Sequence, residues 1–183
     1  PHVFHVSLFH FTSFIGLRAL TIRSSRARFA VSVRFEASGQ RAGLTQVLGI
    51  RGEFMELTQS EALRAYAKMM NTLNVTPLES LLADDFTYES QTVFSALESK
   101  QAFLDYMLAK LQTIKSSGAT VFAEMGMVSA YGNHQPCVIL AQNSKDNLVG
   151  LVLARIAGDK LSRLDLCIVP PPQSAERSGE YPA

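Results

Sequence analysis

The pattern of apolar and polar positions first predicts an amphipathic helix near residue 60. Thr58 and Glu61 have the spacing of a capping box, in which each side chain satisfies a free backbone N–H at the start of a helix. The apolar residues that follow recur at intervals of three and four, which places them on one helical face. They are Leu63, Tyr66, Ala67, Met70 and Leu73.

A short second helix and a first strand are expected next. Thr76-Pro77-Leu78-Glu79 repeats the helix-start pattern, with Thr76 as the N-cap, and this helix should end near Asp84. Phe86, Tyr88 and Ser90 then alternate with more polar neighbours, which is the period of a strand. A brief partner strand is expected around residues 93–97.

A longer helix and four further strands complete the pattern. Ser99 can cap a helix of about four turns, and Gly118 can end it. Its apolar stripe consists of Phe103, Leu104, Met107, Leu108, Leu111 and Ile114. Four strand-like runs follow, over residues 119–130, 137–143, 148–156 and 161–169, separated by segments rich in turn-forming residues. Three prolines at 170–172 end the last strand.

This order of elements indicates an α+β fold. Helices gathered before a run of antiparallel hairpins predict a curved antiparallel sheet that wraps around about three N-terminal helices, as a cone-shaped half-barrel. The run 148–154 is apolar at almost every position, so both of its faces require cover. Because the helices can cover only one face, we expect a homodimer through the convex face, although a swapped tail could cover that face as well.

Charge divides the chain at residue 55. Residues 1–54 contain seven Arg, no Lys and two acids, for a net charge of +5, whereas 55–183 carry ten basic and fourteen acidic residues, for −4. We interpret 1–54 as an N-terminal extension outside the fold, either an upstream or cloning-derived sequence or a targeting segment. The folded domain is then 55–172, and 173–183 form a flexible C-terminal tail.

Composition excludes several classes of function. A net charge of −4 on the folded part argues against a nucleic-acid binder, and no run is long and apolar enough to predict a membrane span. Cys137 and Cys167 lie in separate apolar strand-like runs, where a free thiol behaves as a small apolar side chain, so they predict neither a metal site nor any other cofactor site. The protein is expected to be cytoplasmic.

The layout of the chain resembles the SnoaL-like branch of the nuclear transport factor 2-like superfamily. The resemblance covers residues 56–172, and several short segments are similar to an uncharacterised bacterial subgroup. The segments are Thr87-Tyr88-Glu89-Ser90-Gln91, Leu104-Asp105-Tyr106, Ser117-Gly118, Ala123-Glu124-Met125-Gly126 and Asp165-Leu166-Cys167-Ile168-Val169-Pro170-Pro171. The resemblance implies a half-barrel with a mostly apolar pocket between the sheet and the helices. Members of this superfamily include isomerases, epoxide hydrolases, cyclases, dehydratases and plain binding proteins, so the fold alone does not choose a function.

The steroid isomerases of this superfamily provide the sharpest comparison. Tyr66 falls on their oxyanion-hole tyrosine, but their general-base aspartate falls on Ser90 and their second oxyanion acid on Val152. Proton abstraction from carbon requires a base within reach of the substrate, and a serine without a histidine partner is not one. The resemblance therefore implies no isomerase activity of that type.

The remaining acidic candidates are Asp165 and Glu124. The epoxide hydrolases place an aspartate near the end of the last strand, and that position falls on Val169. Asp165 alternates with Leu164 and Leu166, so it is expected to pair with Arg155 or Arg163 on the convex side. Glu124 is either an exposed alternation residue or a pocket acid with a raised pKa. If either acid faces inward, it could serve as general base with Tyr66 as the electrophilic donor, and an isomerase-, hydrolase- or cyclase-type enzyme without the usual acid-base residues is kept open.

We therefore predict an uncharacterised SnoaL-like protein that binds a small, mostly apolar molecule in the cone pocket. Tyr66, Tyr88 and Ser90 would orient its polar group. The pocket would also be lined by Phe86, Val152, Leu164, Leu166 and Ile168. The catalytic candidates are Tyr66, Ser90, Glu124 and Asp165. The alternative is a non-catalytic dimeric interaction module whose cone is filled by its own side chains.

Overall fold

The computed structural model describes residues 56–92 and 95–183, and begins with the capped helix that the sequence predicts. Helix α1 (Gln59–Thr72) has Thr58 as its N-cap, and Thr58 and Glu61 form both hydrogen bonds of the capping box. The helix ends at Leu73, which adopts a left-handed conformation with φ 52°. Its buried face includes Leu63, Tyr66 and Met70.

The second helix is shorter than predicted. Helix α2 covers only Thr76–Glu79, its N-cap is Val75, and strand β1 (Leu82–Ser90) already begins before Asp84. Thr76 is therefore not the cap. Its backbone N–H and its hydroxyl both bond to the side-chain oxygen of Asn74, which makes a local turn ahead of the helix.

Helix α3 (Lys100–Ser117) has the predicted boundaries. Ser99 accepts a hydrogen bond from the backbone N–H of Ala102, and Gly118 ends the helix with φ 70°. Leu108, which we predicted on its apolar stripe, is 53% exposed. The buried residues are Phe103, Leu104, Met107, Leu111 and Ile114. Position 108 lies at the margin of this stripe, on a side of the helix that is open to solvent.

Six strands form one curved sheet in the order β1-β5-β4-β3-β2-β6. The later strands are β2 (Val121–Ala130), β3 (Asn133–Gln142), β4 (Leu148–Ala157), β5 (Lys160–Cys167) and β6 (Glu176–Arg177). All neighbours are antiparallel except β1 and β5, which are parallel. The expected partner strand at 93–97 is reduced, within the described residues, to one bridge between Tyr88 and Leu97. The predicted α+β half-barrel is thus confirmed, with a mixed sheet.

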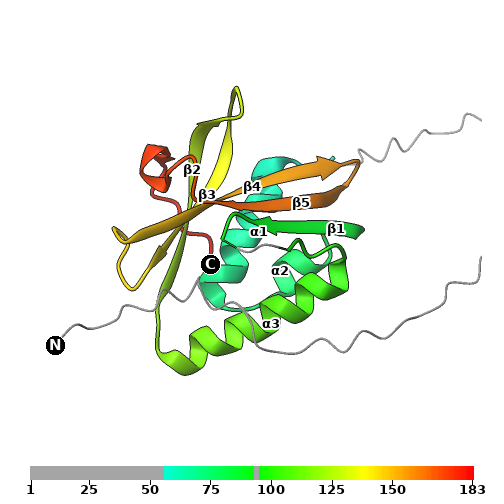
Figure 1. Ribbon diagram of the computed structural model, residues 1–183, viewed down its shortest axis with the longest axis horizontal. Coiled ribbons are helices and arrows are strands. Elements are labelled where there is room, and N and C mark those ends of the chain that lie inside the picture. Colours follow the sequence, from blue (N-terminus) through cyan, green and yellow to red (C-terminus); the bar gives the residue numbers. More distant parts are fainter. Residues whose placement is uncertain (1–55, 93–94) are drawn as a thin grey trace, which may run out of the picture. The chain divides into compact units, whose positions relative to one another are not determined.

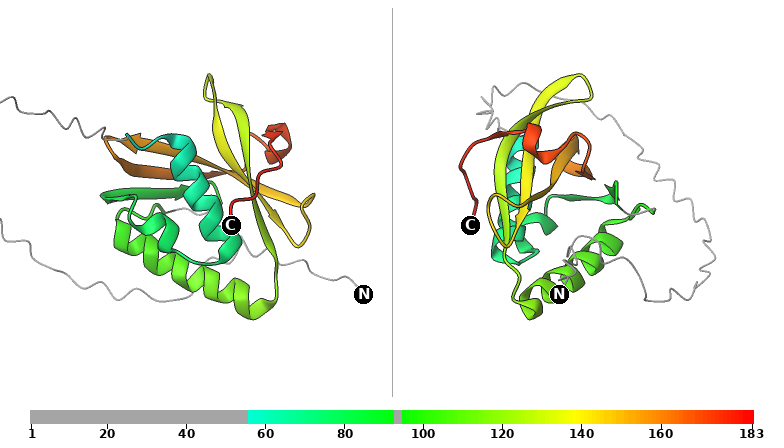
Figure 2. Two further views of the ribbon diagram at one scale, coloured as in Figure 1. Left: turned by 180° about the vertical axis from the view of Figure 1, so that it is seen from behind. Right: turned by 60° about the vertical axis from the view of Figure 1, so that its left-hand side comes forward.

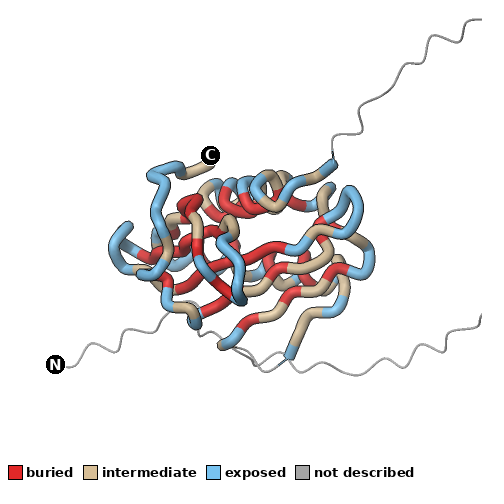
Figure 3. The backbone as a smooth tube through the Cα atoms, turned by 90° about the horizontal axis from the view of Figure 1, so that it is seen from above, coloured by how far each residue is buried: buried red, intermediate tan, exposed pale blue. Residues whose placement is uncertain are grey.

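The sheet has an inner and an outer face, and both are apolar along β4. The three helices cover one face (Figures 1 and 2), and the cluster between them and the sheet includes Phe103, Val152 and Leu164. We call this the inner cluster. The outer cluster lies on the opposite face and consists of Val128, Ala130, Cys137, Ile139, Leu151, Leu153 and Cys167. Figure 3 shows buried positions running along the strands while the turns between them are exposed.

The C-terminal segment covers the outer face, where the sequence predicted a flexible tail. A 3-10 turn at Pro172–Ser174 lies against β4 with Pro172 buried, and Ala175 packs on the outer cluster. Strand β6 then pairs with β2, with Gly126 opposite Arg177 and Met127 opposite Glu176. The segment lacks any apolar periodicity, so its role could not be read from the pattern. Because the chain covers much of β4 by itself, burial of that strand does not require a second copy.

The predicted N-terminal extension, residues 1–54, lies outside the described residues. So do Val93 and Phe94, which were expected to begin the short strand after β1.

Candidate functional site

The structure brings together most of the residues predicted to line a pocket. Tyr66 comes from α1, while Phe86 and Tyr88 come from alternate positions of β1, and all three are buried in the inner cluster. Val152 of β4 and Leu164 and Leu166 of β5 belong to the same cluster. Ser90 follows on the same side of β1 and is 9% exposed. These residues converge because the alternation on each strand turns one set of side chains toward the helices.

Ile168 is placed differently from this group. Strand β5 ends at Cys167, and Ile168 lies just beyond it with 43% of its surface exposed. Its backbone N–H donates to the side-chain oxygen of Gln91 at 2.7 Å, and the same oxygen accepts from Val169 at 2.8 Å. The strand alternation that we extrapolated to residue 168 no longer applies after the strand has ended.

An aromatic group forms the wall between β1 and α3. The Phe103 ring lies 4.8 Å from that of Phe86 and 5.4 Å from that of Tyr88, measured between centroids, and the Tyr88 and Tyr106 rings are 5.9 Å apart. We did not select Tyr106 from the sequence. Its position three residues after Phe103 on the apolar side of the helix was the available signal.

Three phenol groups meet in this region. Burial raises the pKa of Tyr66, Tyr88 and Tyr106, and the pKa values of Tyr66 and Tyr88 are raised further by the proximity of other phenols in the trio. The neighbouring Ser90 side chain acts on the pKa of Tyr88 in the opposite direction. All three phenols therefore remain protonated at neutral pH and can donate hydrogen bonds.

The hydroxyl groups of this region differ in their hydrogen-bond partners. The Ser90 hydroxyl lies 2.8 Å from that of Thr92, so these two form a pair. Tyr66 is 1% exposed, and within the described residues no hydrogen bond is made by its hydroxyl. Among the described residues no fully buried side-chain N or O atom lacks a hydrogen-bond partner, so the Tyr66 hydroxyl keeps a small accessible surface.

Glu124 does not lie in this interior, which corrects its assignment as a pocket acid or an exposed residue. It lies on the outer side of β2 and is buried, with a side chain 4% exposed. Burial alone would raise its pKa, but hydrogen bonds from Arg177, Tyr181 and the Gly179 backbone outweigh burial and lower the pKa. It is therefore a paired carboxylate rather than a general base.

Asp165 forms the ion pairs that its strand position predicts. Its carboxylate lies 2.7 Å from Arg163 and 3.9 Å from Arg155, and Arg163 also contacts Glu89 at 2.6 Å. These residues alternate with Leu164 and Leu166 and so point to the outer face. Neither acidic candidate faces inward, and the condition for acid–base catalysis by either of them is not met.

A hollow of about 520 Å³ lies beside this outer ion-pair network, at the ends of β1 and β5. Its lining includes Arg155, Arg163, Asp165, Cys167 and Tyr131, together with Ser90 and Leu166 from the predicted set. It is thus a mixed-charge groove at one end of the sheet, lined mostly by outer-face residues, and not the apolar pocket that the sequence predicted. Tyr131 at its rim is 69% exposed.

The other candidate groups carry no separate chemistry. Burial raises the pKa values of Cys137 and Cys167, so both remain thiols at neutral pH. Within residues 56–92 and 95–183, no three His, Cys, Asp or Glu side chains are grouped to hold a metal ion. None of the helices in these residues has the length and apolarity needed to cross a membrane.

Comparisons with solved structures find several chains that are similar to this one. One is an NTF2-like protein of unknown function from Cytophaga hutchinsonii, with 14% identity over 64% of this chain and 96% of that chain, and a TM-score of 0.43. Another is an uncharacterized cystatin fold protein from Novosphingobium aromaticivorans, with 16% identity over 61% and 98% of the two chains, and a TM-score of 0.43. A third, from Catenulispora acidiphila, has a ketosteroid isomerase-like fold in complex with trimethylamine. It is 16% identical over 60% and 86% of the chains, with a TM-score of 0.38.

No protein-family model matches the sequence, and no curated protein matches it. At such identities and TM-scores, the likeness to solved structures adds nothing about ligand or reaction. The order of the helices and the curved sheet follow from the structure of this chain alone.

Proposed function

We propose that this protein binds a small, mostly apolar molecule between α1, α3 and the sheet, with a polar group that accepts a hydrogen bond from Tyr66. The observation that carries the proposal is the grouping of three protonated phenols, those of Tyr66, Tyr88 and Tyr106, among the apolar side chains of the inner cluster. A ligand oxygen placed among them would accept a hydrogen bond from Tyr66. The surrounding Phe86, Phe103 and Leu164 would contact the rest of the molecule.

The chemistry of the interior favours binding over turnover. Among the acidic side chains of the described residues, Glu124 is buried, and it lies on the outer face. The inner cluster supplies phenol donors and apolar surface, and neutral phenols do not abstract protons from carbon near pH 7. Beside this cluster, the partly buried Lys110 lies with its Nζ 5.6 Å from the Tyr106 ring centroid, and burial lowers its pKa to about 8. We therefore assign a binding role, in which the ligand's acceptor group is held and its apolar part is removed from water.

Tyr66, Phe86 and Phe103 each expose 1% of their surface or less, so a ligand among them must be small. A suitable probe pair is cyclohexanone and methylenecyclohexane, which differ only by an oxygen in place of a CH₂ group. We expect the ketone to bind about tenfold more tightly, because one hydrogen bond to a buried donor corresponds to roughly 1 kcal/mol or more. Binding is measured by titration of backbone amide chemical shifts in NMR spectra.

The matched variant is Tyr66→Phe, which removes only the hydroxyl. The preference for the ketone should disappear in this variant, while the affinity for methylenecyclohexane stays unchanged. Tyr131→Phe, at the rim of the outer hollow, is the control and should retain the preference. An undiminished ketone preference in Tyr66→Phe, or no shift in the inner cluster with either probe, would refute the proposal.

The outer hollow favours a second candidate, a homodimer formed through the outer face. Tyr131 and Val169 expose 69% and 66% of their surfaces, and the hollow that Tyr131 borders contains both arginines and carboxylates. Such a mixed-charge surface can be self-complementary across a two-fold axis. Native mass spectrometry of the wild type and of Tyr131→Asp tests this candidate: a dimer that dissociates in the variant supports it, and a monomeric wild type refutes it.

A further inference from the structure

The outer edge of β2 is occupied by the chain's own C-terminal residues. Beyond the two pairs of β6, the backbone N–H of Ser178 donates to Met125, and the N–H of Met125 donates to Glu180. An edge strand with free N–H and C=O groups is a template for pairing with another extended segment. Here residues 176–182, which we call the strap, fill that template.

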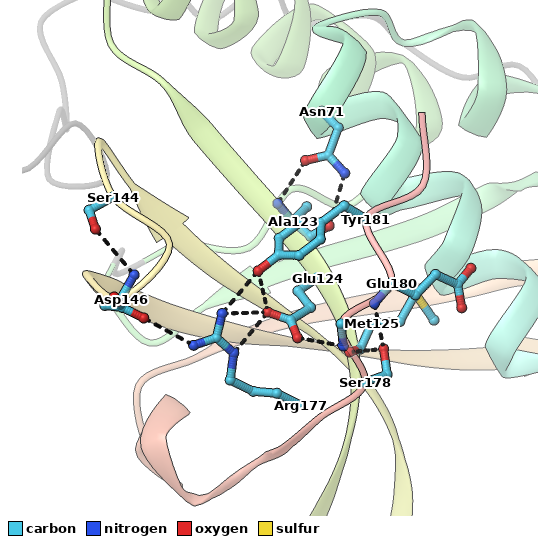
Figure 4. A network of polar contacts seen from close by, with 11 residues as sticks. Asn71, Ala123, Glu124, Met125, Ser144, Asp146, Arg177, Ser178, Glu180 and Tyr181 are labelled. Atoms are coloured by element: carbon cyan, nitrogen blue, oxygen red, sulfur yellow. Dashed lines mark hydrogen bonds and ion pairs between the residues drawn. The ribbon is translucent and has the colours of Figure 1, made fainter.

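The contacts of the strap depend on its sequence. Glu124 accepts hydrogen bonds from Arg177 at 2.8 Å, Tyr181 at 2.6 Å and the backbone of Gly179 at 2.8 Å (Figure 4). The Tyr181 ring also makes a cation–π contact with Lys145, whose Nζ lies 4.0 Å from the ring centroid. A buried carboxylate with three donors from one segment selects that segment, because another sequence would leave the charge unpaired.

Helix α1 also contacts the strap. The amide of Asn71 donates to the carbonyl oxygens of both Ala123 and Pro182, so it links β2 to the end of the strap. Arg64 forms two hydrogen bonds with Glu180, at 2.7 and 3.1 Å. Figure 2 shows the C-terminal segment passing along β2 toward α1. These residues together form a groove for an extended peptide.

The floor of the groove is shaped for close approach. At Gly126, an added Cβ would lie 2.7 Å from the carbonyl oxygen of Glu176 and 2.8 Å from the Ile139 side chain. Glycine is therefore required for the strap to reach the strand at this point. The spacing indicates a site built around peptide backbone rather than a chance contact.

The strap itself buries little apolar surface. Residues 176–180 are exposed, and Arg64 and Glu180 are each about half exposed at their ion pair. The apolar anchors, Pro172 and Ala175, lie before the strap. Local opening of such a segment costs less than unfolding of the core. An open strap would leave the β2 edge and Glu124 available to another segment of the same sequence.

We propose that this groove is a peptide-docking site, and that its second occupant is the strap of another copy of the chain. Each copy would present one groove and one strap, so exchange between two copies is reciprocal and closed. The strap of the same chain has an effective concentration in the millimolar range. Exchange is therefore favoured when copies are concentrated or already associated.

Two full-length variants test the exchange, each with Cys137→Ala and Cys167→Ala so that one added cysteine is the only thiol in the chain. Met127→Cys in one chain and Glu176→Cys in a second, tagged chain place thiols at paired positions of β2 and β6, so a disulfide between them can form only across copies. We expect a mixed disulfide that increases with concentration and falls at least fivefold when the Met127→Cys chain also carries Glu124→Ala. The control combines both cysteines in one chain. Rapid closure within that chain and no mixed disulfide would overturn the proposal.

A second measurement does not depend on disulfide geometry. A fluorescein-labelled peptide of residues 174–183 is titrated into the full chain carrying Arg177→Ala, which weakens its own strap but leaves the groove intact. We expect binding at least tenfold tighter than to the wild type, and loss of that binding when Gly126→Val is added. Absence of peptide binding to the Arg177→Ala chain, or binding that Gly126→Val leaves unchanged, would overturn the proposal.

Discussion

The inner and outer clusters are two apolar layers on one sheet, but they are covered in different ways. The inner cluster is covered by helices whose periodic apolar residues, such as Met107 and Leu111, interlock with the strands. The outer cluster is covered in part by Pro172 and Ala175, which belong to a segment without periodicity. The inner layer should therefore hold most of the stability, whereas the outer layer can open locally.

The largest effect is expected from the inner cluster. Phe103→Ala removes a ring that contacts Phe86 and Tyr88 and should lower the free energy of unfolding by about 3–5 kcal/mol. Leu108→Ala on the same helix is the control and should change it by about 0.5 kcal/mol or less, because Leu108 is 53% exposed. Urea denaturation measures both. Equal losses would contradict the contrast between the buried and exposed sides of α3.

Removal of the C-terminal segment should have a smaller effect. A chain ending at Pro171 loses the cover of Leu151 and Leu153 and should unfold about 2 kcal/mol more easily, since partial exposure of two leucines costs roughly that amount. The dye 8-anilinonaphthalene-1-sulfonate should bind to the newly exposed face. A truncated chain that neither loses stability nor binds the dye would show that the outer cluster is covered by other residues.

The same contrast explains what the sequence could predict. Helices α1 and α3 and the strands follow from apolar periodicity and from the caps at Thr58, Ser99 and Gly118, because those signals act over a few residues. Tyr66 and Tyr88 lie in the inner cluster, as helical spacing and strand alternation predicted, whereas Ser90 also lines the outer hollow. The direction of the pKa shift of Glu124 could not be predicted, since it depends on hydrogen bonds from Arg177 and Tyr181, which lie more than fifty residues later in the sequence.

The contribution of Glu124 to the stability of the outer layer should depend on pH. Contacts from Arg177, Tyr181 and Gly179 hold the folded pKa of Glu124 below its ordinary value of 4.5. Its contribution is therefore present above pH 4.5, where the unfolded carboxyl is also ionised, and is lost as the pH falls through the lower folded value.

Glu124→Gln is the variant that isolates this contribution. Its melting temperature should be lower than that of the wild type at pH 7, and the difference should shrink as the pH is lowered from 5 to 3. Glu56→Gln, in an exposed position before α1, is the control and should follow the wild type at every pH. A Glu124→Gln difference that stays constant across this range would mean that the carboxylate is not paired in solution.

The smallest effect on stability is expected for Tyr66→Phe, the variant most important for the proposed function. Because the Tyr66 hydroxyl has no acceptor in the described part of the chain, its removal should change the free energy of unfolding by about 0.5 kcal/mol or less, or slightly increase it. Ser90→Ala breaks the pair with Thr92 and should cost about 1 kcal/mol. Urea denaturation of both variants distinguishes the two hydroxyls. A loss above 2 kcal/mol for Tyr66→Phe would show that this phenol is bonded within the protein and is not available to a ligand.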